Sequence, residues 1–250
     1  MKFLAFDTST DVMSIAVTDG ERVWQHTGPG GAASSATLIP AILALLADSG
    51  LGLGDLDAIA FGRGPGSFTG LRTACAVAQG LAFGANHGGG IPVLPVDTLM
   101  ALAEEARFRH GGLSGGDLQV TALLDARMDE MYVQRFEFTG TACHPGDDCR
   151  LVRPENLLLD VNAGLLTGNV FGVYQERLPA ALESFTRLEA LPTATAILRL
   201  APALAAAGRC VDAALALPLY VRDKVALTTQ ERDLAKALKT QTAAGSVKLN

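Results

Sequence analysis

Two stretches of this chain share one pattern, in which an apolar strand ends in aspartate and is followed by a short polar turn and a second strand. The first stretch covers residues 2–18, and its aspartate is Asp7. The second covers residues 118–138, and its aspartate is Asp125. A unit repeated at the start of each half predicts a duplicated α/β domain with a mixed sheet in each copy. Two unrelated hairpins are the alternative interpretation.

A glycine-rich segment at residues 111–116 is the clearest linker, and we place the boundary between the two halves there. The expected division is an N-terminal lobe over residues 1–110 and a C-terminal lobe over residues 117–222. Residues 223–250 are polar and are expected to form a helix or tail that is partly disordered.

Between these landmarks the pattern predicts alternating strands and helices. The further strands are expected near residues 22–25, 58–61, 91–96 and 164–167. The helices are expected at residues 34–49, 67–85, 98–109 and 193–207, with a possible short helix after Pro154. The loop at residues 27–33 is expected to be mobile because its residues are small.

The most distinctive stretch is a glycine-rich turn that joins the strand at 58–61 to the helix at 67–85. Its glycines allow positive φ angles and close approach of another backbone, and Ser67 or Thr69 can cap the helix. The free N–H groups of that helix would suit an anion, but a tight turn without a ligand fits equally, since the lysine of a P-loop is absent. The residues of this signature turn are Gly62, Gly64, Pro65, Gly66, Ser67, Thr69, Gly70 and Arg72.

Composition excludes several classes of function. The net charge is −6, and no run of Lys and Arg is longer than two residues, so the chain itself should bind nucleic acid poorly. Neither a signal peptide nor a membrane span is expected, so the predicted location is the cytoplasm without membrane contact. The four cysteines and four histidines have no zinc-ligand spacing, so no metal site is expected.

Two lobes that each open with a strand ending in Asp resemble the actin/Hsp70/sugar-kinase (ASKHA) superfamily. In that superfamily the aspartate holds Mg²⁺ through water, and the turn after it binds nucleotide phosphates through a glycine. Here the turn reads Asp7, Thr8, Ser9 and Thr10, and Ser9 adds a side chain where the phosphate would approach. The second turn, at 125–127, also lacks glycine. The resemblance implies a two-lobed ASKHA fold with a vestigial nucleotide loop.

The residues 3–10, 62–72, 125–127 and 218–226 together closely resemble the TsaB (YeaZ) family. The resemblance implies a non-catalytic subunit, not an enzyme, in bacterial tRNA threonylcarbamoyladenosine (t6A) synthesis. Its expected partners are the catalytic subunit TsaD, bound through the N-lobe helices, and the ATPase TsaE. Contact with tRNA would be indirect, the isolated chain should form a homodimer, and no cofactor is expected except a nucleotide at the interface with partners.

The helices at 34–49 and 67–85 carry more apolar and small residues than one buried face needs. Packing in the protein's own core explains this, and so does a surface for another protein. With the family resemblance, the predicted partner contacts are Leu38, Ile42, Leu45, Phe68, Leu71 and Cys75. Two alternatives stay open: an ATP-binding kinase or ATPase of the same superfamily, and, more remotely, a protein like the M22-type metalloproteases.

Overall fold

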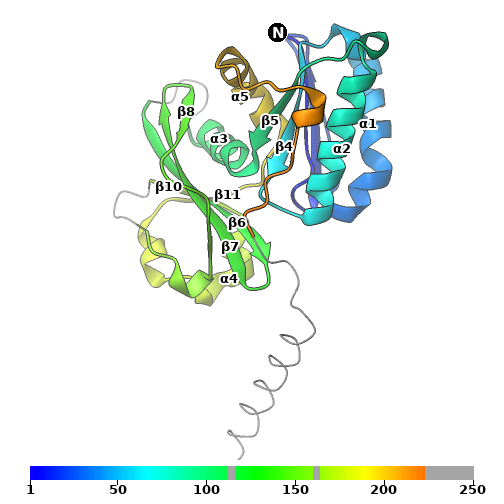
Figure 1. Ribbon diagram of the computed structural model, residues 1–250. Helices are drawn as coiled ribbons and strands as arrows, with labels where there is room; N and C mark the ends of the chain where they lie inside the picture. The colour runs from blue at the N-terminus through cyan, green and yellow to red at the C-terminus, as the bar shows by residue number, and fades with distance from the viewer. Residues whose placement is uncertain (112–115, 160–163, 223–250) are drawn as a thin grey trace, which may run out of the picture.

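The computed structural model describes residues 1–111, 116–159 and 164–222, which form two mixed β-sheets with helices around them (Figure 1). The first sheet has the order β3-β2-β1-β4-β5. In it β1, β2 and β3 are antiparallel neighbours, whereas β4 runs parallel to β1 and β5 runs parallel to β4. Its strands are β1 (Phe3–Asp7), β2 (Val12–Thr18), β3 (Val23–Pro29), β4 (Ala58–Gly64) and β5 (Val93–Asp97).

The second sheet has the order β11-β10-β6-β7-β8, with β9 also paired to β7. The pattern matches the first sheet, because β6, β7 and β8 are antiparallel neighbours and β10 and β11 are parallel additions. The strands are β6 (Leu118–Arg127), β7 (Glu130–Thr139), β8 (Ala142–Pro145), β9 (Arg150–Val152), β10 (Leu165–Gly168) and β11 (Arg187–Glu189).

Side chains alternate across β1, so each face of the first sheet has its own core. Leu4 and Phe6 point to the face that α1 (Ser34–Ser49) and α2 (Phe68–Gly84) cover. Phe3 and Ala5 point to the opposite face, where they meet α3 (Thr98–Gly111) and α5 (Ala194–Ala206). The helix α3 also packs against β6, so it lies between the two sheets (Figure 1). The short helix α4 (Val170–Tyr174) belongs to a third core on the far side of the second sheet.

The predicted duplication is confirmed by the shared strand order and by the two opening hairpins. Asp7 pairs with Ser14 in the first hairpin, and Asp125 pairs with Met131 in the second. The fold is therefore the predicted two-lobed, ASKHA-like α/β fold. The lobe boundaries remain a prediction, because residues 112–115 of the linker and residues 223–250 lie outside the described part of the chain.

Several local predictions were wrong. Residues 27–29, expected to begin a mobile loop, form the end of β3 and pair with β2, since the sheet satisfies their backbone groups. Pro154 begins a 3₁₀ turn of three residues instead of a helix.

Candidate functional site

The signature turn joins β4 to α2, as predicted. Ser67 is the N-cap of α2, and its Oγ accepts a hydrogen bond from the Gly70 N–H at 3.4 Å. The Gly64–Pro65 peptide bond is cis. Of the two predicted capping residues, Ser67 therefore fills the role and Thr69 does not.

The turn packs directly on the loop between β1 and β2. The Ser67 N–H donates to the Ser9 carbonyl at 2.7 Å, and the Thr8 hydroxyl donates to the Gly70 carbonyl at 2.7 Å. A Cβ on Gly70 would overlap the backbone of Thr8, so glycine is required for this approach. The turn therefore covers the loop that the superfamily resemblance assigned to nucleotide phosphates.

Asp7 is enclosed beneath this cover. Its side chain has no exposed surface, and Oδ1 accepts hydrogen bonds from the N–H (2.9 Å) and hydroxyl (2.6 Å) of Ser9. Gly62 lies against the carboxylate, since a Cβ there would overlap it. Burial raises the pKa of Asp7 to about 6, although hydrogen bonds from Ser9 and Thr98 oppose the shift.

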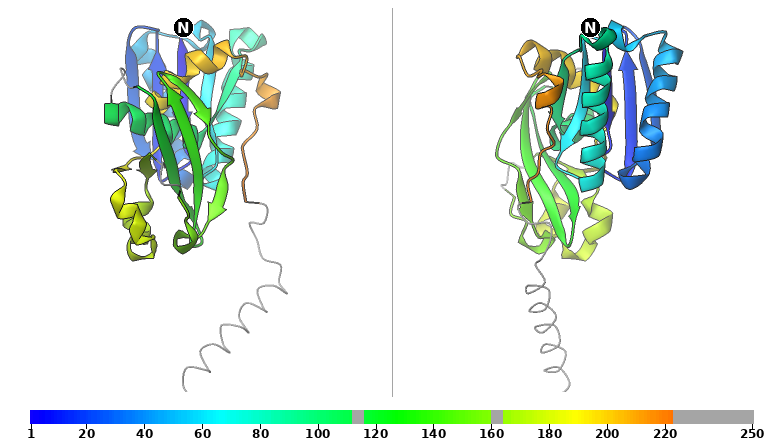
Figure 2. Two further views of the ribbon diagram at one scale, coloured as in Figure 1. Left: turned by 90° about the vertical axis from the view of Figure 1, so that its left-hand side faces the viewer. Right: turned by 45° about the vertical axis from the view of Figure 1, so that its right-hand side comes forward.

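A segment at residues 216–222, which we call the strap, runs beside α2 toward the second sheet (Figure 2). The Tyr220 ring lies 5.5 Å from the Phe68 ring, centroid to centroid. The Arg72 guanidinium lies over the Phe68 ring, 3.7 Å from its centroid. The Nε of Arg72 also donates a hydrogen bond to the Tyr220 hydroxyl at 3.1 Å. Sequence reasoning missed this contact between the signature turn and the strap, because nothing local relates the two segments.

The last described residue of the strap, Arg222, is tied to the turn between β6 and β7. Its Nη2 donates to the carbonyls of Ala126 and Arg127, each at 3.2 Å, and to the Glu130 carboxylate at 2.7 Å. Because the strap also holds the signature turn, it connects α2 of the first lobe to the opening hairpin of the second.

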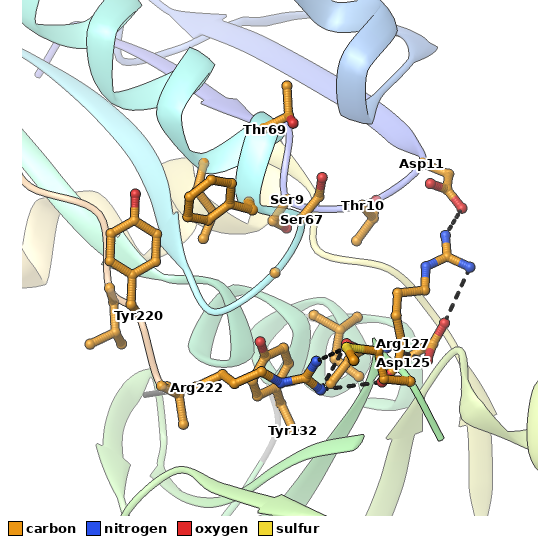
Figure 3. A pocket seen from close by; sticks show the side chains of 18 of the residues that line it. Ser9, Thr10, Asp11, Ser67, Thr69, Asp125, Arg127, Tyr132, Tyr220 and Arg222 are labelled. Carbon is orange, nitrogen blue, oxygen red and sulfur yellow. Dashed lines mark hydrogen bonds and ion pairs between the residues drawn. The ribbon is translucent and has the colours of Figure 1, made fainter. Parts of the chain in front are cut away.

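A cavity of about 340 Å³ lies between the signature turn, the strap and the two hairpin turns (Figure 3). Arg127 reaches across it from the second hairpin to Asp11 of the first, and it also pairs with Asp125. The polar side chains in its lining are Ser9, Thr10, Asp11, Ser67, Thr69, Asp125, Arg127, Tyr132, Asn169, Tyr220 and Arg222. Thr10 and Ser9 of the vestigial loop thus face the cavity, whereas Asp7 and Thr8 are not part of its lining.

The predicted partner contacts need correction. Phe68 is 41% exposed, but the other five side chains are buried in the core of this chain, namely Leu38, Ile42, Leu45, Leu71 and Cys75. The large apolar side chains of α1 and α2 that do face outward are Ile39 (43% exposed), Leu43 (50%) and Phe83 (73%), in addition to Phe68. Both helices are apolar on most sides, so helical spacing did not separate the inner face from the outer one.

Within the described residues, no group of three or more His, Cys, Asp and Glu side chains could hold a metal ion. The same part of the chain contains no helix that is long and apolar enough to cross a membrane.

Comparison with known proteins decides the family. The chain matches the family model of tRNA N6-adenosine threonylcarbamoyltransferase (TsaD) over residues 25–248. It is 32% identical to the tRNA threonylcarbamoyladenosine biosynthesis protein TsaB of Escherichia coli over 234 residues, which is 90% of this chain and 96% of that protein. The chain belongs to the TsaB (YeaZ) family.

Two further TsaB-family proteins agree with this assignment. The TsaB of Haemophilus influenzae is 42% identical over 138 residues, a match that spans about half of each protein, 53% of this chain and 52% of that one. The solved structure of YeaZ from Pseudomonas aeruginosa is 35% identical, with a TM-score of 0.75 over 88% of this chain and 99% of that chain. The family resemblance noted in the sequence is thus confirmed, and the chain is a member of a tRNA threonylcarbamoyladenosine biosynthesis family.

Proposed function

We propose that this TsaB-family chain is a non-catalytic subunit that docks on TsaD and, with TsaE, supports threonylcarbamoylation of adenosine 37 in tRNAs that read ANN codons. The chain would hold TsaD in its active arrangement and contact tRNA only through its partners. Support for a docking role comes from the outward face of α1 and α2, whereas support for a non-catalytic role comes from the enclosed Asp7.

The outward face of α1 and α2, which we call the docking face, carries the observation on which the proposal depends. It exposes four large apolar side chains, Ile39, Leu43, Phe68 and Phe83. Each of the two helices contains a single charged residue, Asp48 in α1 and Arg72 in α2. An outward helical pair with aromatic and aliphatic side chains and almost no charge is typical of a protein–protein interface. When TsaD is absent, the same face would pair two copies of this chain.

The enclosed Asp7 supports a role without nucleotide chemistry in this chain. A metal-bound water needs an exposed carboxylate beside an open phosphate site, but the signature turn packs over Asp7 and its Ser9 neighbour. A nucleotide would then bind only where partners complete a site. The observed packing therefore gives the ATP-binding kinase alternative no support, because the kinase reading requires Asp7 to face the cleft.

Binding to purified TsaD of the same organism tests the docking face. Leu43→Glu and Phe83→Glu each place a charge in the proposed interface and should weaken binding in calorimetry by about tenfold or more. Leu158→Glu is the matched control, because Leu158 is 82% exposed and lies in the second lobe. Circular dichroism confirms folding of each variant. If the folded helix variants bind TsaD as tightly as wild type, the docking proposal is wrong.

A further inference from the structure

One wall of the cavity between the lobes carries a tyrosine hydroxyl that has no acceptor among the described residues. Tyr132 is 7% exposed, lines the cavity and has no hydrogen-bond partner for its hydroxyl among the described residues. Arg222 Nε is buried and likewise has no acceptor in the described part of the chain. Figure 3 shows both side chains on one wall, with Ser67 and Thr69 on the wall opposite. The Tyr132 hydroxyl is a donor that a molecule in the cavity can reach, whereas the buried Arg222 Nε is closed off from the cavity.

The surroundings of Tyr132 keep its hydroxyl protonated. Burial is the main cause of the raised pKa of Tyr132, so its phenol stays neutral and keeps its proton. The guanidinium of Arg222 donates through Nη2 to two carbonyls and to Glu130, so these bonds hold it in place. The Tyr132 hydroxyl therefore donates, and a ligand at this wall must accept.

Charges around the cavity decide which kind of acceptor fits. Arg127 pairs with Asp11 and Asp125, and Arg222 pairs with Glu130. Three carboxylates thus accompany two guanidinium groups, so the local field does not favour an anion. An uncharged carbonyl or amide oxygen accepts from the Tyr132 hydroxyl without this electrostatic cost.

The apolar part of the lining and the volume of the cavity limit the size and shape of the ligand. Apolar surface from Phe68, Leu71, Leu124 and Tyr220 lines the cavity. The volume of about 340 Å³ is at the small end of the range for small-molecule sites. Aromatic side chains beside an apolar slot favour a planar group, which can stack on their faces.

We propose that the cavity is a binding site for a small, uncharged, planar molecule whose carbonyl or amide oxygen accepts a hydrogen bond from Tyr132. The site differs from a Mg²⁺-nucleotide site in its location, since Asp7 is outside it, and in its preference for a neutral ligand. It also goes beyond the docking role, because it uses the cleft side of the turn and not the outward face of α1 and α2.

Fragment binding to the full chain tests the proposal without any partner, so its outcome is independent of the docking experiment. Benzamide is the probe, and benzoate and toluene are its matched comparisons, one charged and one without an acceptor. Benzamide should bind with a dissociation constant on the order of millimolar in ligand-detected NMR. Benzoate and toluene should bind more weakly. Equal binding of all three would overturn the proposal.

Two further measurements locate the site. Tyr132→Phe removes only the hydroxyl and should weaken benzamide binding by about threefold to tenfold. In wild type labelled with ¹³Cζ tyrosine, benzamide should shift the Tyr132 resonance, whereas Tyr174, which does not line the cavity, should stay in place. This second measurement needs no variant to fold. A shift of Tyr174 alone, or no shift of Tyr132 at saturation, would contradict the assignment.

Discussion

Replacing Asp7 by Asn should make the protein less sensitive to pH and more stable at neutral pH. The Asn Oδ1 can still accept the two hydrogen bonds that Ser9 donates to Asp7 Oδ1 at 2.9 and 2.6 Å. The substitution adds no volume beside Gly62, which leaves no room for a larger group. The main change is therefore the loss of a titrating carboxyl group in a site without solvent.

The size and sign of the effect follow from the pKa of Asp7, which burial raises from 3.8 to about 6. A shift of about 2 units corresponds to about 3 kcal/mol of unfolding free energy. Because the folded-state pKa lies above the unfolded one, the stabilising contribution is complete below pH 3.8 and is lost as pH rises through about 6. Asp7→Asn has no carboxyl group at this position and does not lose this stability. Its unfolding free energy relative to wild type should therefore rise by about 3 kcal/mol as the pH increases from 3.8 through about 6.

Urea unfolding of wild type and Asp7→Asn at a series of pH values between about 4 and 8 measures the difference directly. Asp48→Asn, which removes an exposed carboxylate on α1, is the control for the loss of a surface charge. The contributions of the other titrating groups to the pH dependence of stability cancel in the comparison, since both proteins contain these groups. A stability difference between wild type and Asp7→Asn that does not change with pH would refute the reasoning.

Three other predictions concern the core and the cleft. Gly70→Ala should destabilise by about 3 kcal/mol or more because its Cβ would overlap Thr8, whereas Gly80→Ala, with open space around it, should be neutral or stabilising by up to about 1 kcal/mol. Thermal unfolding measures both. Glu104→Gln should cost about 3–5 kcal/mol in urea unfolding, since it removes one partner of the buried ion pair with Arg107, both of them 2% exposed. Calorimetry with Mg–ATP should show no tight stoichiometric binding to the isolated chain, because Asp7 is enclosed. Tight stoichiometric binding would contradict this role of the enclosed Asp7.

The sequence predicted most elements because their signals are local. Alternating or continuous apolar runs mark β1, β6 and the central strands, and the polar turns mark the hairpins between them. The short strands β8, β9 and β11 were missed, since each has four residues or fewer and takes its conformation from pairing with a neighbour. The register of a sheet edge is decided by distant segments, so periodicity within a few residues carries little information about it.

The site was predicted less well, for a related reason. The signature turn and the loop at Asp7 were both recognised, but no feature of either indicated that one packs on the other. The strap was recognised only as part of the family pattern at 218–226, and its contacts with Phe68 and Arg72 span about 150 positions of sequence, as in the hydrogen bond of Arg72 to Tyr220 at a separation of 148. Long-range contacts of this kind decide which residues face the cavity.

The packing of the signature turn on the first hairpin gives its glycines a structural role that differs from anion binding. A glycine-rich turn before a helix suggests an anion site, because bare backbone can approach a phosphate. Here Gly62 and Gly70 are bare for another reason, since the atoms that approach them belong to Asp7 and Thr8. The same hairpin that would bind phosphate in an ASKHA enzyme is thus filled by the protein's own turn. The turn fixes the start of α2, and with it the direction of the docking face, so the residues that close the nucleotide loop are the ones that position the proposed interface.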